Sequence, residues 1–392
     1  MRTFSIEERR RMLVHKHHLR GDADGPERVT KALVALHATD PATVYLSVLA
    51  RTSTTTIADV ASSLYENRTL VRWMAMRRTL FVFPTVDVPA IQGAVSTPLA
   101  ATLRRQLISR LDRNGSEPAL GTDADEWLDI VGADVDAALE SAGAATGAQL
   151  AAAVPALRTT IHPGSPSEKP QNVTSPLLTV MSTAGRMVRG TPTGPWTSRH
   201  HLWEPVDHWW PNGLPLMDPA ESQAMLARRW LERYGPATAD DLQWWTGWNK
   251  TTTRAALSRL PIEEVDLHGV AGIDLRHDAS TPDDDAVPEA TLLPSLDPTS
   301  MGWRDRKWFL GIDPQQIFDP AGNIGPTIWW NGEIIGSWAV ARTGEIRTAI
   351  AADRGSSAVH QIELAAERLQ RRLNGALVTP AIRTPLERSL VN

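Results

Sequence analysis

The clearest structural pattern lies between Ala220 and Arg276 and reads AESQAMLARRWLERYGPATADDLQWWTGWNKTTTRAALSRLPIEEVDLHGVAGIDLR. Apolar residues recur at helical spacing, Gly and Pro interrupt them, and alternating residues follow. The pattern predicts three helices and a two-stranded hairpin, in the order Ala220–Tyr234, Thr238–Trp245, Lys250–Leu260, Ile262–Leu267 and Gly272–Arg276. Helices joined by a short Gly-containing turn and followed by a hairpin are typical of a winged helix-turn-helix.

The same order of elements recurs upstream without residue-level similarity. It is predicted as helices at Asp123–Ala142, Thr146–Ala153 and Val173–Ala184 and strands at Arg186–Arg189 and Thr197–Trp203. A Pro-, Ser- and Gly-rich stretch at Thr159–Pro170 reads as a loop. A second winged helix is therefore expected here.

The remaining segments are mainly helical at the N-terminus and β-rich at the C-terminus. Helices are predicted at Phe4–Leu19, Arg28–Leu36, Pro41–Ala50, Ile57–Glu66 and Pro98–Arg113, with a strand at Thr79–Pro84. A hairpin with a type I′ turn is predicted at Asn331-Gly332. Strands at Ser337–Val340 and Glu345–Ile350 follow, and a helix at Ser356–Leu373 is expected to be capped by Ser356 or Ser357 and to end at Asn374-Gly375.

Composition excludes several kinds of protein. The chain has 392 residues, 42% of them hydrophobic, so a sizeable core is expected. It has no Cys, which rules out disulfides, thiolate metal sites and Cys nucleophiles. The sequence shows no run of about 18 apolar residues and no secretory signal, so a cytoplasmic protein is expected.

Charge is distributed unevenly. The formal net charge is −5, which by itself argues against nucleic acid. However, Arg68–Arg113 holds eight Arg against Asp87 and Asp112, a local charge of +6. The acidic residues gather instead in Asp266–Glu289, including Asp283, Asp284 and Asp285, which is predicted to be a solvated loop. An Arg-rich composition is explained either by codon usage or by phosphate recognition, for which Arg is well suited.

Ordered stretches along the chain resemble a known family. They are Ala35-Leu-His-Ala-Thr-Asp-Pro41, Leu70-Val-Arg72 with Met74-Ala-Met-Arg77, Tyr234-Gly-Pro-Ala-Thr238, Gly302-Trp-Arg-Asp-Arg306 and Ile317-Phe-Asp-Pro320. In this order they are similar to the AlkZ/YcaQ-like winged-helix DNA glycosylases, bacterial enzymes that release bulky alkylated bases. No single stretch identifies the family; the resemblance rests on all of them occurring in this order.

The resemblance implies an α+β, mainly helical fold with three tandem winged helices around a concave DNA channel and a small C-terminal antiparallel β-element. The expected divisions are residues 1–120, with the first winged helix and the catalytic motif, 121–215 and 216–280, with the second and third winged helices, and 281–392, with the β-element and terminal helix. The family's Gln-x-Gln or Gln-x-Asp catalytic motif corresponds to His37-Ala38-Thr39 in this sequence.

The chemistry of such a site is compatible with His37 and Thr39. An N7-alkylated purine is cationic and leaves readily, so the enzyme has mainly to position a water molecule and stabilise an oxocarbenium-like state. A neutral His both orients water and accepts its proton, and a Thr hydroxyl adds a hydrogen bond. The alternative is that His37 packs at a helix end and Thr39 begins the turn before Pro41.

DNA-contact candidates are basic or polar residues near the predicted wings and recognition helix. They are Arg72, Arg77, Arg78, Arg199, His200, Lys250, Thr251 and Arg254. A helix N-terminus and cations favour phosphate. An ordinary solvated surface is the alternative for each of them.

Other clusters have simpler interpretations. His15, His17 and His18 suggest a solvated helix face more than a metal site, and Trp209-Trp210 and Trp244-Trp245 suggest core more than base stacking. Asp297 is expected to form a buried ion-pair network with Arg304, Asp305 and Arg306, with a catalytic carboxylate as the alternative.

The sequence thus predicts a monofunctional DNA glycosylase that acts on bulky N7-alkylated purines in base excision repair or in self-resistance to a genotoxin. The alternative is a non-catalytic winged-helix protein that binds lesions or regulates transcription. The expected partner is double-stranded DNA. No cofactor, metal or obligate protein partner is expected, and the protein is expected to be a monomer.

Overall fold

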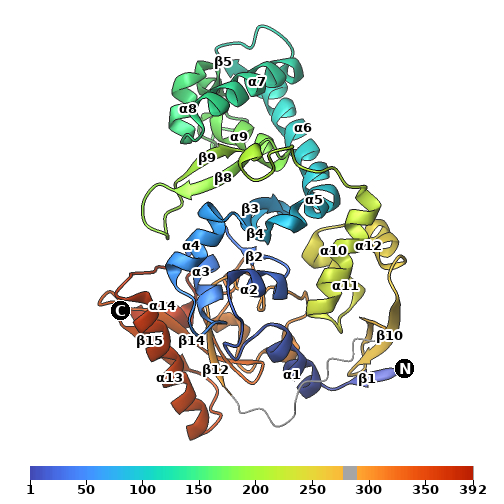
Figure 1. Cartoon of the computed structure of the whole chain (residues 1–392), viewed down its shortest axis with the longest axis vertical. Coiled ribbons are helices and arrows are strands. Elements are labelled where there is room, and N and C mark those ends of the chain that lie inside the picture. Colours follow the sequence, from blue (N-terminus) through green and yellow to red (C-terminus); the bar gives the residue numbers. More distant parts are fainter. Residues whose placement is uncertain (277–288, 392) are drawn as a thin grey trace. The chain divides into compact units, whose positions relative to one another are not determined.

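The computed structural model describes residues 1–276 and 289–391 and shows an α+β chain in which helices predominate (Figure 1). The chain forms two compact units. The first joins residues 1–70, 81–84 and 224–392, and the second joins residues 71–80 and 85–223. Residues 277–288, which hold most of the predicted acidic loop with Asp283, Asp284 and Asp285, lie outside the described residues.

The first unit begins with one short strand and a series of helices. The elements are β1 (Arg2–Phe4), α1 (Ile6–Lys16), α2 (Pro26–Ala32), β2 (Leu36–His37), α3 (Pro41–Leu49) and α4 (Ile57–Ala61), which continues as a π-helical turn at Ser62–Glu66. Every residue of α3 is buried, so this helix is a central element of the unit.

The helix predicted at Arg28–Leu36 is wrong at its C-terminal end. α2 ends at Ala32, and Val34 adopts a left-handed conformation with φ of 61°. Leu36 and His37 then form β2, which pairs antiparallel with Val82 and Phe81 of β4 (Thr79–Pro84). The strand predicted at Thr79–Pro84 is confirmed. Pairing between strands distant in sequence therefore overrode the local helical pattern.

The predicted helices and hairpin between Ala220 and Arg276 are present. They are α10 (Pro219–Tyr234), α11 (Ala239–Thr246), α12 (Lys250–Leu257), β10 (Ile262–Leu267) and β11 (Ala271–Leu275). Gly247 ends α11 in the left-handed conformation. The N-terminal strand β1 adds to the hairpin by pairing parallel with β10, which the sequence pattern did not predict.

A four-stranded antiparallel sheet forms the C-terminal part of the unit. Its strands are β12 (Ala290–Leu293), β13 (Thr327–Trp330), β14 (Glu333–Val340) and β15 (Ile346–Ile350). Positive φ angles at Asn331 (48°) and Gly332 (77°) confirm the turn between β13 and β14. The sheet contacts α13 (Ser356–Leu373) and α14 (Pro385–Val391). Gly355, rather than a serine, stands at the N-cap of α13 and makes no side-chain capping bond.

The second unit is built around three longer helices, α6 (Thr97–Asn114), α7 (Ala124–Ala142) and α9 (Thr174–Thr183). Its other elements include β3 (Leu70–Ala75), α5 (Val88–Ile91), α8 (Gly147–Ala153), β8 (Met187–Pro192) and β9 (His201–Pro205). The short strands β5 (Ser116–Glu117), β6 (Thr160–Ile161) and β7 (Gln171–Asn172) form a small sheet, so the predicted loop at Thr159–Pro170 is partly extended strand.

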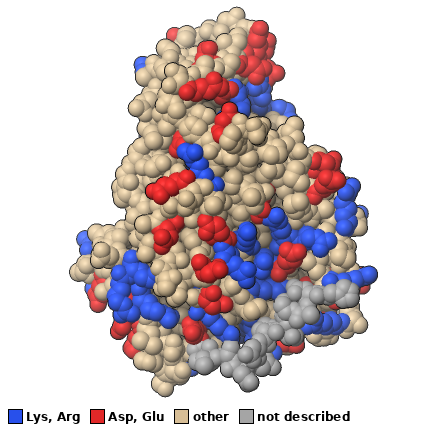
Figure 2. All heavy atoms as spheres, viewed as in Figure 1, with Lys and Arg blue, Asp and Glu red and all other residues tan. Residues whose placement is uncertain are grey.

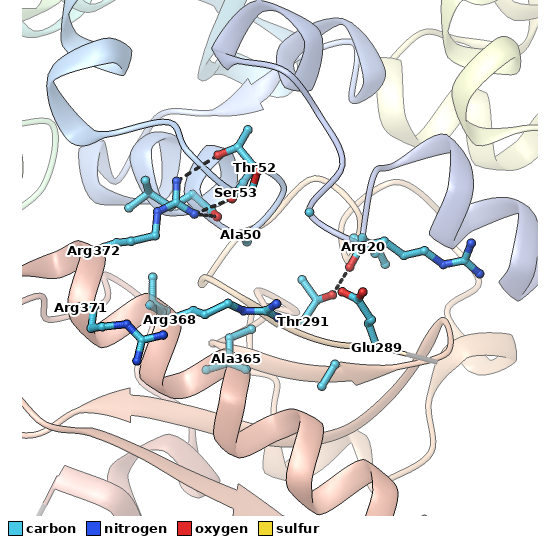
Figure 3. Close-up of a pocket in the computed structure, with 16 residues that line it drawn as sticks. Arg20, Ala50, Thr52, Ser53, Glu289, Thr291, Ala365, Arg368, Arg371 and Arg372 are labelled. Carbon is cyan, nitrogen blue, oxygen red and sulfur yellow. Dashed lines mark hydrogen bonds between the residues drawn. The ribbon is translucent and has the colours of Figure 1, made fainter. Parts of the chain in front are cut away.

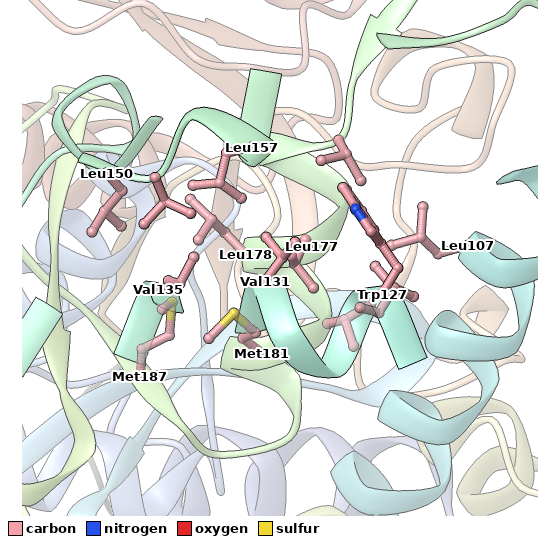
Figure 4. Packing of buried hydrophobic residues seen from close by; sticks show 14 of the residues in the cluster. Leu107, Trp127, Val131, Val135, Leu150, Leu157, Leu177, Leu178, Met181 and Met187 are labelled. Carbon is pink, nitrogen blue, oxygen red and sulfur yellow. The ribbon is translucent and has the colours of Figure 1, made fainter. Parts of the chain in front are cut away.

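The core of this second unit is mainly aliphatic and includes two tryptophans, Trp127 and Trp203. Figure 4 shows Trp127 and Val131 of α7 beside Leu177, Leu178 and Met181 of α9. Leu107 of α6 joins the same cluster, which extends to Leu150 and Leu157. Burial of these side chains fixes α6 against α7 and α9, and it leaves the opposite side of α6 in solvent.

In the described ranges, 1–276 and 289–391, no helix is both long enough and apolar enough to cross a membrane.

Candidate active site and DNA-contact residues

The His37-Ala38-Thr39 segment lies where β2 ends and α3 is about to begin. Ala38 is buried, His37 is half-buried and Thr39 is exposed. His37 and Thr39 are thus both more exposed than the Ala38 that lies between them. Solvent therefore reaches both of the side chains that were predicted to be catalytic.

The His37 ring is held from one side by the neighbouring strand. His37 is opposite Phe81 in the β2–β4 register, and the two rings meet edge to face with centroids 5.4 Å apart. The Nδ1 atom of His37 is buried. Aromatic packing and burial of one ring nitrogen restrict the orientation of the imidazole, which favours its use in positioning a water molecule.

Asp40 anchors the segment from the other side. It is the N-cap of α3, where one carboxylate oxygen accepts from the main-chain nitrogen of Ala42 at 3.3 Å. The second oxygen accepts from the main-chain nitrogen of Ala381 at 2.9 Å. The carboxylate is buried. These two bonds therefore fix the N-cap of α3, which comes directly after Thr39, to the segment around Ala381 near the C-terminus.

A fully buried ion pair lies at the other end of α3. Arg51 bonds both carboxylate oxygens of Asp297, at 2.7 and 2.9 Å, and Ser47 Oγ donates to the same carboxylate at 2.7 Å. The predicted partners of Asp297 were therefore wrong. Arg304 is largely exposed and lies 3.8 Å from Asp240 instead, because Arg51 satisfies Asp297 from within the core.

His17 belongs to the same buried network. Its ring nitrogens lie 2.9 Å from Thr299 Oγ1 and 3.1 Å from the main-chain oxygen of Arg233. Burial, followed by the charge of Arg51, holds the pKa of His17 well below its usual value. Among the described residues, no group of His, Asp and Glu is arranged to hold a metal ion, and this neutral histidine has a packing role.

The tip of the β3–β4 hairpin carries two of the predicted DNA contacts. Arg77 and Arg78 are exposed and both adopt the left-handed conformation, with φ of 53° and 58°. Non-Gly residues in this region are uncommon and strained, which is a feature of functional sites. Arg72 is instead buried, and its Nη2 donates to the main-chain oxygen of Gly190 at 2.6 Å, so it holds β8 in place.

The other candidates lie on the two hairpin-bearing segments. Arg199 and His200 are exposed just before β9, in the second unit. Lys250, Thr251 and Arg254 are exposed on α12, in the first unit. Asn249 caps this helix by accepting from the main-chain nitrogen of Thr252 at 2.9 Å. The predicted contacts are thus divided between the units.

The tryptophan pairs are mainly packing residues. Trp209 and Trp245 are buried, which supports the core interpretation for one member of each pair. Trp210 packs edge to face on Trp73, with centroids 5.6 Å apart. Trp244 lies under the Arg306 guanidinium, 5.1 Å from the ring centroid.

Two hollows of the first unit are rich in Arg but do not include His37. In one, of about 300 Å³, Figure 3 shows Arg368, Arg371 and Arg372 reaching from α13. There Arg372 Nη1 donates hydrogen bonds to the main-chain oxygens of Leu49 and Thr52, at 2.5 Å each. The other, of about 420 Å³, is lined by Lys16, Arg28, Arg228, Arg233 and Arg276, and Figure 2 shows Lys and Arg gathered around α10.

Comparisons with known proteins give two matches. A family model described as "DNA glycosylase AlkZ-like" matches residues 30–372. The solved structure of the Streptomyces sahachiroi DNA glycosylase AlkZ is similar, with a TM-score of 0.72 and 17% sequence identity, over 97% of this chain and 99% of that chain. At this identity the structural likeness concerns the fold. No curated protein matches this chain.

Proposed function

Since the chain belongs to the AlkZ-like DNA glycosylase family, we propose that it is a monofunctional glycosylase that hydrolyses the N-glycosidic bond of bulky N7-alkylated purines. The observation that carries the proposal is that His37 and Thr39 are both accessible to solvent, between a paired strand and a buried helix that are both fixed in place. The expected setting is a bacterial cytoplasm, with the protein acting as a monomer in DNA repair.

The proposed reaction breaks the bond between the anomeric carbon and the purine nitrogen. The bonding electrons leave with the cationic base, which becomes neutral, and the sugar passes through an oxocarbenium-like state. Water then bonds to the anomeric carbon and its proton passes to the neutral imidazole of His37, and from there to solvent. The Thr39 hydroxyl helps to orient the water. The products are the free base and an abasic site.

We propose that DNA is held by three winged helices. The helix-and-hairpin order of α10–α12 with β10 and β11, and of α7–α9 with β8 and β9, supports two of them. Arg77, Arg78, Arg199, His200, Lys250, Thr251 and Arg254 are the proposed contacts, since all are exposed and basic or polar. The burial of Arg72 supports a role in shaping the hairpin rather than in direct contact.

One observation favours a second candidate function. His37 and Thr39 stand where the family motif, Gln-x-Gln or Gln-x-Asp, has its two catalytic side chains. Neither His nor Thr carries the side-chain amide of Gln. A protein that keeps the scaffold but not the chemistry would bind lesions or regulate transcription. Binding without base release is the behaviour that separates this candidate from the first.

The test is base release from duplex DNA that contains N7-methylguanine or a bulky N7 adduct, with abasic sites revealed by alkali. We expect release above the buffer control, and a loss of about 10²-fold in His37→Ala. His15→Gln, which changes an exposed histidine of the same unit, is the matched control and should retain the rate. Absence of product with both lesions, despite DNA binding, favours the second candidate.

A further variant tests the assigned chemistry. His37→Gln restores a side chain that orients water but cannot accept its proton, so partial activity is expected. A rate that needs a neutral imidazole falls at acidic pH, and this fall should be absent in His37→Gln. Equal rates and pH profiles for His37→Ala and the unaltered protein would remove His37 from the mechanism.

A further inference from the structure

One side of α6 carries arginines that the core does not use. Leu103, Leu107 and Leu111 of α6 are buried in the second unit. Arg105, Arg110 and Arg113 are separated from one another by three, five and eight residues. At about 100° per residue these spacings place them within roughly 140° of one another on the helix. We call the surface formed by Thr102, Arg105, Gln106, Ser109, Arg110 and Arg113 the α6 arginine face.

The charges of this face are not neutralised by carboxylates in the described structure. Arg105 donates to Thr102 Oγ1 at 3.1 Å, Arg110 to Gln171 Oε1 at 3.3 Å, and Arg113 to the main-chain oxygen of Ser109 at 3.0 Å. These acceptors are all neutral. Three guanidinium charges on one helix side repel one another, and binding of an anion would relieve that repulsion.

In contrast to these three residues, Arg104 on the same helix is neutralised by carboxylates. Its guanidinium contacts Asp125 at 2.6 Å and Asp129 at 2.8 Å, both on α7. Arg104 therefore connects α6 to α7 through two ion pairs. Arg105, Arg110 and Arg113 bond neutral acceptors instead. The difference indicates that the α6 arginine face is not required for packing.

The face is hollowed in a way that suits an extended anion. Its six residues line an open hollow of about 400 Å³, and neither Asp, Glu nor an apolar residue is among the described residues that line it. A second hollow of about 110 Å³ shares Gln106 and Arg110 and adds Arg78 from the hairpin tip. Within the second unit, the basic surface therefore continues from α6 to one of the proposed DNA contacts.

We propose that the α6 arginine face contacts the phosphate backbone of duplex DNA. Arg105 and Arg113 are eight residues apart, or about 12 Å along the helix axis. A DNA strand carries one phosphate per about 3.4 Å of axis, so three or four phosphates span this length. Arg, Ser, Thr and Gln are the side chains that contact DNA backbones. A mainly polar surface of this kind differs from the aromatic-rich centres of protein interfaces.

This inference rests on the proposed DNA-binding function but not on catalysis. The test is the affinity of the full chain for an undamaged duplex, measured over a range of salt concentrations. Each phosphate contact adds about 0.9 to the slope of log K against log salt. The variant Arg105→Gln, Arg110→Gln, Arg113→Gln should therefore lower this slope by roughly 2 to 3. Gln preserves helix propensity, so the variant should keep its fold.

A matched control removes the same charge elsewhere. Arg347, Arg354 and Arg371 each lie within 3.5 Å of a carboxylate, on Glu345, Glu333 and Glu367 respectively. Replacing these three by Gln changes the net charge equally but removes arginines that are already paired. The control should keep the salt slope within about 1 of the unaltered protein.

The outcomes separate this inference from the proposed function. An unchanged slope in the α6 variant, or an equal fall in the control, overturns the α6 contact. An equal effect on double-stranded RNA or heparin would mean a general polyanion surface and would overturn the assignment to duplex DNA. Base release is measured separately: its absence alongside the expected fall in slope would reject the glycosylase and leave the α6 contact in place.

Discussion

Arg51 and Asp297 form a two-pronged ion pair whose side chains are both fully excluded from solvent. Arg51 follows α3, which begins next to the His37-Ala38-Thr39 segment, and Asp297 lies 246 residues further along the chain. The pair therefore joins the helix that follows the candidate motif to the segment that precedes the C-terminal hairpin. Its role is to hold α3 in place, since both side chains are inaccessible to a substrate.

Breaking this pair on one side should be costly. Arg51→Met leaves the Asp297 carboxylate buried without its cation, and we expect a loss of about 3–5 kcal/mol in the free energy of unfolding. The double variant Arg51→Met, Asp297→Asn removes the uncompensated charge and should lose less than the sum of the single variants. Denaturant titration measures both. Additive losses would show that the two side chains are not coupled.

His17 should make the stability of the first unit depend on pH. Its pKa is lowered in the folded chain, chiefly because burial disfavours the charged imidazolium. Below the unfolded pKa of about 6.5, the unfolded chain takes up a proton that folded His17 does not. The contribution of neutral His17 to the free energy of unfolding is therefore fully present above about pH 6.5. It is lost as the pH decreases, by up to about 1.4 kcal/mol per pH unit.

The corresponding variant is His17→Gln, studied by denaturant titration between about pH 5.5 and about pH 7. The slope of stability against pH should be smaller than in the unaltered protein. It should not vanish, because burial also lowers the pKa of His18, in the same unit, and gives a slope of the same sign. If the two slopes are equal, His17 does not titrate as its burial indicates.

Gly336 lies in β14, where a larger residue cannot be accommodated. A Cβ at this position would overlap the main-chain oxygen of Ala349 in the adjacent strand β15. Since backbone cannot rotate away as a side chain can, Gly336→Ala should cost about 1–3 kcal/mol. Gly147→Ala is the control, because its nearest neighbour is a Leu178 methyl at 3.6 Å and Ala favours helix α8. Similar melting temperatures for the two variants would contradict this reading.

Local patterns predicted most elements but not the contacts between distant segments. The strand Thr79–Pro84 was predictable because β-branched and aromatic residues precede a proline. The strand Leu36–His37 was not, because its apolar neighbours continue a helical pattern and only pairing with β4 makes it extended. The short β1 was missed for the same reason, since its stability comes from pairing with β10.

The candidate site shows the same limit. The position of His37 followed from the ordered resemblance, but its contact with Phe81 depends on strand register. The choice of Arg51 as partner of Asp297 depends on burial, and sequence neighbours such as Arg304 were misleading. The α6 arginines were visible as a local basic segment. Only the structure separates Arg104, paired with Asp125, from Arg105, Arg110 and Arg113.

Asp40 should link stability to catalysis. Asp40→Ala removes the N-cap of α3 and the acceptor for the main-chain nitrogen of Ala381. Loss of a cap costs about 1 kcal/mol, and a buried donor left without a partner adds about 1–3 kcal/mol. Because Asp40 directly follows Thr39, its loss should also release the motif from its fixed position. We expect base release to fall by more than DNA affinity.

The control for this prediction is Asp123→Ala. Asp123 caps α7 in the second unit by accepting from the main-chain nitrogens of Asp125 and Glu126, at 3.1 and 3.0 Å. It should lose a similar cap energy without affecting base release, since it is far along the chain from His37 and lies on an exposed surface. If both variants lose base release in proportion to stability, Asp40 acts only through folding. If Asp40→Ala alone loses it at a temperature where both variants are folded, the start of α3 positions the catalytic segment.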